Sequence, residues 1–139
     1  MFMYKQELEK SGKWFQQISG RLAQTISKTK GPDSIITNVL APHTWANGDK
    51  SRDTASEIRQ EFFQILTETM LEQKQGHYHL VVGDMNTRLH ARLPRESSIM
   101  GPHIFGRGEE FVRDMPQLDK ENRQLLISSL ETSEHYHIS

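Results

Sequence analysis

Residues 79–86 read HLVVGDMN, a short apolar run that ends abruptly in a glycine, an acid and an amide. Such a run, bounded by turn-forming residues, is typical of a buried β-strand. In α/β sheets, ligands and catalytic groups collect at the carboxyl ends of the strands. The octet therefore predicts a strand with polar side chains at its tip, and Asp84 and Asn86 are the candidate functional residues.

The segments before this octet predict a strand, a helix and a second strand. Residues 34–40 read SIITNVL, which is β-branched and mostly apolar and indicates a strand. Residues 54–57 read TASE, a capping-box pattern. Apolar side chains then recur at helical spacing, so we expect a helix that stops near Gly76. With a strand at 78–82, this order is that of a layered α/β fold.

The remaining segments carry weaker signals. Residues 17–28 are expected to form a strand that pairs with the strand at 34–40 as a hairpin, because KGPD at 30–33 is turn chemistry. The first fifteen residues favour neither state. Residues 87–116 are rich in Gly and Pro and are expected to be irregular, followed by a helix at 118–131. Residues 135–138 look like the start of a further strand.

Composition limits the function classes. The chain has 139 residues, enough for one domain, and its 17 Lys+Arg against 18 Asp+Glu give a net charge of −1. There is no overall basic field that attracts nucleic acid, so any phosphate contact must be local. The absence of cysteine excludes disulfides, thiolate catalysis and zinc–cysteine sites.

Targeting and core size can also be read from the composition. No apolar stretch approaches the roughly 18–20 residues of a membrane span, and the first residues lack a secretory-signal layout. The expectation is an intracellular protein of unassigned compartment, without a membrane segment. Hydrophobic residues make up 35% of the chain, which predicts a thin core and a missing protein partner or chain.

Four motifs resemble, in the same order, the endonuclease/exonuclease/phosphatase superfamily. They are ITNVLAPH at 36–43, GDMN at 83–86, GPHIFG at 101–106 and ENRQLL at 121–126. The similarity is greatest to the endonuclease domains of non-LTR retrotransposons and their domesticated relatives. It extends from about residue 16 to the end of the chain.

The resemblance implies an α/β fold in which two sheets form a sandwich, and an enzyme that cuts phosphodiester bonds in DNA with a divalent metal, usually Mg²⁺. In that chemistry Asp84 orients or deprotonates the attacking water and Asn86 steadies the phosphate oxygens. Their i, i+2 spacing at a strand end is expected to point both side chains the same way. Arg88 follows the motif and is the candidate contact to the phosphate backbone, with a solvated loop arginine as the alternative.

The chain also departs from the family pattern. Leu40 stands where family members commonly place an active-site tyrosine just before Ala-Pro. The family's metal-binding glutamate lies before the matched region, and its closing aspartate and histidine are expected beyond Ser139. The metal ligands are therefore unassigned, since Asp84 and Asn86 alone hold Mg²⁺ poorly. We expect residues 1–139 to form a single, incomplete domain, the central fragment of the sandwich.

Three functional hypotheses follow. The first is a remnant of a Mg²⁺-dependent DNA endonuclease of retroelement type, with little or no turnover by this chain alone. The second is a non-catalytic structural or accessory subunit of a larger assembly. The third is nucleic-acid binding without cleavage, against which the neutral charge balance counts.

Overall fold

The computed structural model describes residues 13–28, 30–43, 52–72 and 77–137. The chain divides into two compact units. The sheet unit comprises residues 1–41 and 72–84, and the helical unit comprises residues 42–71 and 85–139. The protein is therefore of the α/β class. Among the described residues, no helix is both long and apolar enough to cross a membrane.

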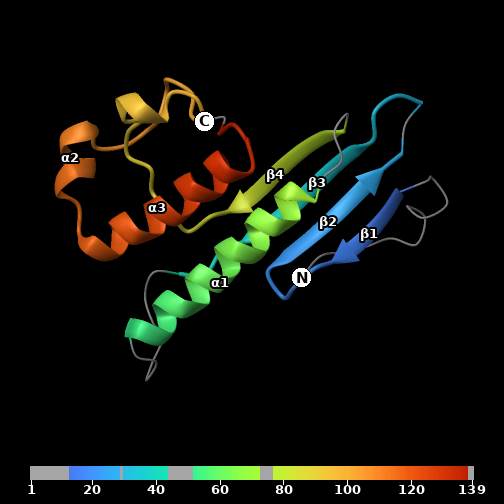
Figure 1. The fold of residues 1–139 in the computed structure, drawn as a ribbon, viewed down its shortest axis with the longest axis horizontal. Helices are drawn as coiled ribbons and strands as arrows, with labels where there is room; N and C mark the ends of the chain where they lie inside the picture. Colours follow the sequence, from blue (N-terminus) through green and yellow to red (C-terminus); the bar gives the residue numbers. More distant parts are fainter. Residues whose placement is uncertain (1–12, 29, 44–51, 73–76, 138–139) are drawn as a thin grey trace. The chain divides into compact units, whose positions relative to one another are not determined.

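The sheet unit holds one four-stranded sheet with the strand order β1-β2-β3-β4 (Figure 1). Its strands are β1 (Lys13–Gln17), β2 (Leu22–Ser27), β3 (Ser34–Leu40) and β4 (Tyr78–Asp84). The β1–β2 and β2–β3 pairs are antiparallel, whereas β3 and β4 are parallel. The hairpin and the strand–helix–strand order are confirmed, although β2 is shorter than expected and β4 runs two residues further. The described part of the chain forms this one sheet, and a second sheet is not shown.

One face of the sheet is buried. Inward-facing residues alternate along β3, where Ile35, Thr37 and Val39 are all buried. The polar groups on this face are hydrogen-bonded to one another: Gln24 Nε2 donates to Thr37 Oγ1 at 3.0 Å, and Thr37 Oγ1 lies 2.8 Å from His79 Nε2. These bonds remove the penalty of burying unpaired polar atoms.

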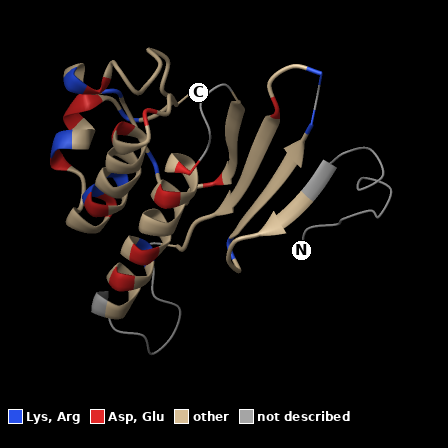
Figure 2. Cartoon of the chain, turned by 45° about the vertical axis from the view of Figure 1, so that its right-hand side comes forward, with Lys and Arg blue, Asp and Glu red and all other residues tan. Residues whose placement is uncertain are grey.

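The opposite face of the sheet exposes several large apolar side chains, and the polar Asn38 and, at the end of β4, Asp84 lie on the same face. Ile36 and Leu40 of β3 are 38% and 49% exposed, and Leu80 and Tyr78 of β4 are 52% and 70% exposed. We call these four side chains the open face. The strands β2 and β3 carry no charged residue, and Figure 2 shows that the positions of charged residues lie mainly on the helices and turns. The apolar side chains that β3 contributes to the open face therefore have no charged residue of the same strand between them.

Gly83 allows β4 to lie close to β3 at its tip. Its φ is +136°, a conformation that L side chains rarely adopt. A Cβ placed on Gly83 collides with the backbone carbonyl of Val39 on the neighbouring strand. The glycine before Asp84 therefore has a structural reason that is independent of any chemistry.

The helical unit contains α1 (Arg52–Leu71), the short 3₁₀ helix η2 (Pro94–Glu96), α2 (Glu109–Asp114) and α3 (Gln117–Thr132). The helix expected at 118–131 is confirmed as α3. The expected capping box is wrong, because α1 already begins at Arg52 and Thr54 lies inside it. The helix also ends at Leu71, before the expected stop near Gly76.

The helices α1 and α3 pack against each other. They contribute most of the buried apolar side chains of this unit: Phe62, Phe63, Leu66, Met70, Leu126, Ile127 and Leu130. A hydrogen bond joins the two helices, because Thr67 Oγ1 donates to Ser129 Oγ at 2.8 Å. Burial of these side chains is the main stabilising contribution within the helical unit.

A further expectation for the helical unit is wrong, because residues 87–116 are not wholly irregular but include η2 and α2. Of the strand start expected at 135–138, residue 138 lies outside the described residues, and the described part forms a single bridge between Met100 and His137. Short elements of this kind depend on contacts that are distant in sequence, which local patterns do not reveal.

Candidate functional site

Asp84 is the last residue of β4 and is exposed at the carboxyl end of the parallel β3–β4 pair. Its partner in the register is Leu40, the last residue of β3. The backbone continues this pairing one step further, because the Ala41 N–H donates to the Asp84 carbonyl at 2.8 Å. The prediction that an acid stands at the tip of a strand is confirmed, but the prediction that this strand is buried is wrong, because the residues of β4 are all exposed or half-buried. The immediate neighbour of Asp84 on the next strand is an exposed leucine.

Asn86 follows two residues later, in the helical unit and outside β4. Its φ of +46° is left-handed, a conformation that asparagine tolerates better than most residues. The expectation that the side chains of Asp84 and Asn86 point the same way assumed that both residues belong to the strand, and this assumption is wrong. Strand alternation ends with β4 at Asp84, so it does not fix the direction of the next side chains.

The helix α3 fixes the loop around Asn86. Asn122 Nδ2 donates to the Asn86 carbonyl at 2.8 Å and to Thr87 Oγ1 at 2.7 Å. Thr87 Oγ1 in turn donates to the Met85 carbonyl at 3.0 Å. Asn122 is buried, so its amide is a positioning group for the loop backbone.

Arg88 is exposed on the same loop, where its guanidinium is accessible to a ligand. Its contact to a phosphate backbone stays a prediction, as do the catalytic roles of Asp84 and Asn86. Within the described ranges, no group of three or more His, Cys, Asp and Glu side chains is arranged to hold a metal ion. Mg²⁺ is commonly held by one or two carboxylates together with water, so the absence of such a group does not test a magnesium site at Asp84. The magnesium site stays a prediction.

A buried ion pair contacts the backbone that follows this loop. Arg123 of α3 donates from Nη1 and Nη2 to the two carboxylate oxygens of Glu96 at 2.7 and 2.6 Å. It also donates to the carbonyls of Leu89 and Ala91 at 3.1 and 2.9 Å. The second partner of Glu96 is the Leu93 N–H, which donates to Oε2 at 2.7 Å. Bidentate geometry of this kind is the strongest form of an arginine–carboxylate pair.

The charge state of Glu96 follows from these contacts. Burial raises the pKa of the Glu96 carboxyl. The hydrogen bonds from Arg123 and Leu93 and the charge of Arg123 lower this pKa, and together they outweigh the effect of burial. The net effect holds the pKa below its ordinary value of 4.5. Glu96 is therefore ionised at neutral pH, and the ion pair is intact there.

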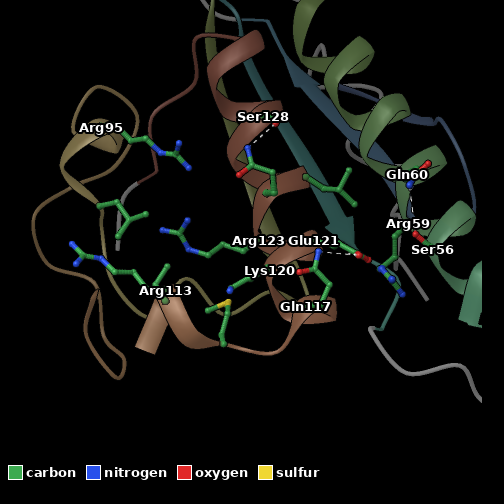
Figure 3. Close-up of a pocket in the computed structure, with 15 residues that line it drawn as sticks. Ser56, Arg59, Gln60, Arg95, Arg113, Gln117, Lys120, Glu121, Arg123 and Ser128 are labelled. Carbon is green, nitrogen blue, oxygen red and sulfur yellow. Dashed lines mark hydrogen bonds between the residues drawn. The ribbon is translucent and has the colours of Figure 1, made fainter. Parts of the chain in front are cut away.

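A pocket of about 530 Å³ opens between the helices of this unit (Figure 3). Five cationic side chains line it, namely Arg59, Arg95, Arg113, Lys120 and Arg123. Glu121 is its one acidic lining residue. Sequence reasoning missed this pocket. The sequence did contain one indication that polar side chains of α3 are buried. Asn122 and Arg123 lie one turn before Leu126, on the face of α3 that packs inward.

The comparisons with known proteins add no assignment. No protein-family model matches the chain, and no curated protein or solved structure is significantly similar to it.

Proposed function

We propose that this chain is a remnant of a Mg²⁺-dependent DNA endonuclease of retroelement type, and that it has little or no phosphodiesterase activity by itself. The sandwich of that superfamily is part of the same proposal, with the observed sheet as one of its two layers. The observation that carries the proposal is the exposed carboxylate of Asp84 at the carboxyl end of the parallel β3–β4 pair.

The proposed roles follow from the chemistry of phosphodiester hydrolysis. A carboxylate orients or deprotonates the attacking water, which is the role of Asp84. An amide donates to a phosphate oxygen and steadies the developing charge, which is the role of Asn86. Arg88 adds a contact to the DNA backbone that carries no sequence information.

The side chain beside Asp84 is a reason to expect little turnover. Leu40 occupies the register position next to Asp84 and is half exposed, so an apolar group borders the proposed phosphate position. Leucine neither donates a hydrogen bond nor stabilises negative charge. Removing one donor that stabilises a transition state lowers turnover about 10²–10³-fold in well-studied enzymes.

A nicking assay tests this proposal. Supercoiled plasmid is incubated with Mg²⁺ and the wild-type chain, with Asp84→Ala, or with Asp114→Ala as a matched carboxylate control on α2. We expect the three proteins to nick at the same background rate. Nicking by the wild type and Asp114→Ala that disappears in Asp84→Ala would overturn the claim that the chain has little or no turnover.

A second candidate is a non-catalytic accessory subunit, favoured by the open face of the sheet. Ile36, Leu40, Tyr78 and Leu80 expose apolar surface of the kind that marks protein interaction sites. In the described sheet β4 is also an edge strand, with one side available for pairing. Sedimentation of the purified chain tests this candidate. A well-dispersed monomer at high concentration would count against a subunit whose apolar face requires a partner.

A further inference from the structure

The cationic pocket of the helical unit is independent of the β4 tip. Its walls come from α1, η2, α2 and α3, all within one compact unit. At about 530 Å³ it lies within the range of roughly 300–1,000 Å³ typical of small-molecule sites.

Two of its five cations form ion pairs with glutamates. Arg123 is held by the buried Glu96, and Arg113 Nη2 lies 3.5 Å from the carboxylate of Glu109. Neither glutamate lines the pocket. When both are counted together with the lining Glu121, the set still carries two more positive than negative charges.

Arg95 and Lys120 are the cations best placed to bind a ligand. Neither forms an ion pair with any other residue in the described part of the chain. Arg95 is exposed and extends from η2 toward α3, whereas Lys120 is half-buried on α3 (Figure 3). A guanidinium and an ammonium that line one concavity favour an anion with several oxygens.

The pocket also has an apolar lining. Val112 and Met115 are buried, and Leu93 and Leu125 are half-buried. A ligand that only carried charge would leave the half-buried Leu93 and Leu125 uncovered. A small molecule with both an anionic group and an apolar part satisfies both kinds of lining.

We propose that this pocket binds a small organic phosphate, with its phosphate group held by Arg95 and Lys120 and its apolar part against Leu93, Val112, Met115 and Leu125. The site goes beyond the proposed function, since none of its residues belongs to the β4 tip. Arg123, which is held by the buried Glu96, also lines the pocket.

Calorimetric titration of the full chain tests the site. The probes are phenyl phosphate, inorganic phosphate and the neutral analogue phenol, each at low and high salt. We expect phenyl phosphate to bind more tightly than inorganic phosphate, phenol not to bind, and affinity to fall at high salt. Charge-assisted hydrogen bonds predict that Arg95→Gln and Lys120→Gln each weaken phenyl phosphate binding about tenfold.

The matched control is Lys30→Gln, which removes an exposed positive charge of the sheet unit that does not line the pocket. It should leave the affinity unchanged. Thermal unfolding of all three variants checks that they fold, which the exposure of Arg95 favours. Equal binding by the wild type and the Arg95→Gln/Lys120→Gln double variant, or no binding of phenyl phosphate, would overturn the proposal. Tighter binding of a single-stranded oligonucleotide than of phenyl phosphate would also overturn the proposal, because the cationic side chains would then form a nucleic-acid binding site.

Discussion

Both units contain buried polar contacts, but in the described part of the chain the buried ion pair lies in the helical unit. In the helical unit the strongest polar contacts lie inside, where Arg123 and Glu96 pair and Asn122 holds the loop after β4. In the sheet unit the acid of interest, Asp84, is exposed, and an exposed apolar face lies on the same sheet. The difference indicates that the helical unit adds a buried ion pair and a buried amide to its apolar core, whereas the sheet unit exposes its acid and part of its apolar surface. Substitutions in the two units should therefore differ in their effect on stability.

Loss of Arg123 should have the largest effect. Arg123→Ala leaves the buried Glu96 carboxylate and the Leu89 and Ala91 carbonyls without their partner. Breaking a buried ion pair on one side costs about 3–5 kcal/mol in the free energy of unfolding. Urea unfolding measures this loss. Gln124→Ala, on the exposed face of the same helix, is the control and should change stability by about 0.5 kcal/mol or less. Similar values for the two variants would contradict a central role of the ion pair.

Loss of the Asn122 amide should have an intermediate effect. Asn122→Leu keeps the approximate size of the side chain and adds no charge, but removes the donor to the Asn86 carbonyl and Thr87 Oγ1. We expect a loss of about 1–3 kcal/mol, the penalty for burying unsatisfied polar groups. Amide hydrogen exchange of residues 85–88 should become faster in this variant. Unchanged protection there would show that α3 does not position the loop.

Acidification should destabilise the fold in two stages. Burial lowers the pKa of both His137 and His90 from 6.5, with the charge of Arg107 adding to the shift at His90, so the unfolded chain takes up these protons first and stability falls as the pH drops below 6.5. The Glu96 pKa is below 4.5, so the contribution of Glu96 is present above 4.5 and is lost as the pH falls through its lower folded value. Thermal unfolding between neutral and acidic pH measures both stages. Glu96→Gln should remove the second stage and leave the first, and a second stage that persists in this variant would assign it elsewhere.

A change on the open face should have the smallest effect on stability. Leu80→Lys adds a charge to a side chain that is already half exposed, so we expect a change of about 0.5 kcal/mol or less. Its effect should appear in sedimentation instead, as weaker self-association at high concentration. A large loss of stability would mean that Leu80 is covered and that the face is not open.

Sequence reasoning predicted the elements whose signals are local. The β-branched run at 34–40 and the apolar periodicity at 118–131 both gave elements close to β3 and α3. The pattern at 54–57 misled, because a capping-box sequence also occurs inside α1, where Arg52 already begins the helix. The helix η2 could not be predicted, since Glu96 depends on Arg123, which lies 27 residues away in the sequence.

The candidate sites divide in the same way. Asp84 was predicted at a strand tip because the apolar run before it and the polar residues after it are adjacent in sequence. The cationic pocket was not predicted, because Arg95 and Lys120 come from different elements and neither stands in a motif. Charges brought together only by tertiary packing leave no periodic signal.

The rate of plasmid nicking in Mg²⁺, compared between the wild type and Asp84→Ala, tests most directly whether the β4 tip retains its position but not its chemistry. Our account predicts that the two rates are indistinguishable. A wild-type rate clearly above that of Asp84→Ala, with Asp114→Ala as active as the wild type, would contradict it.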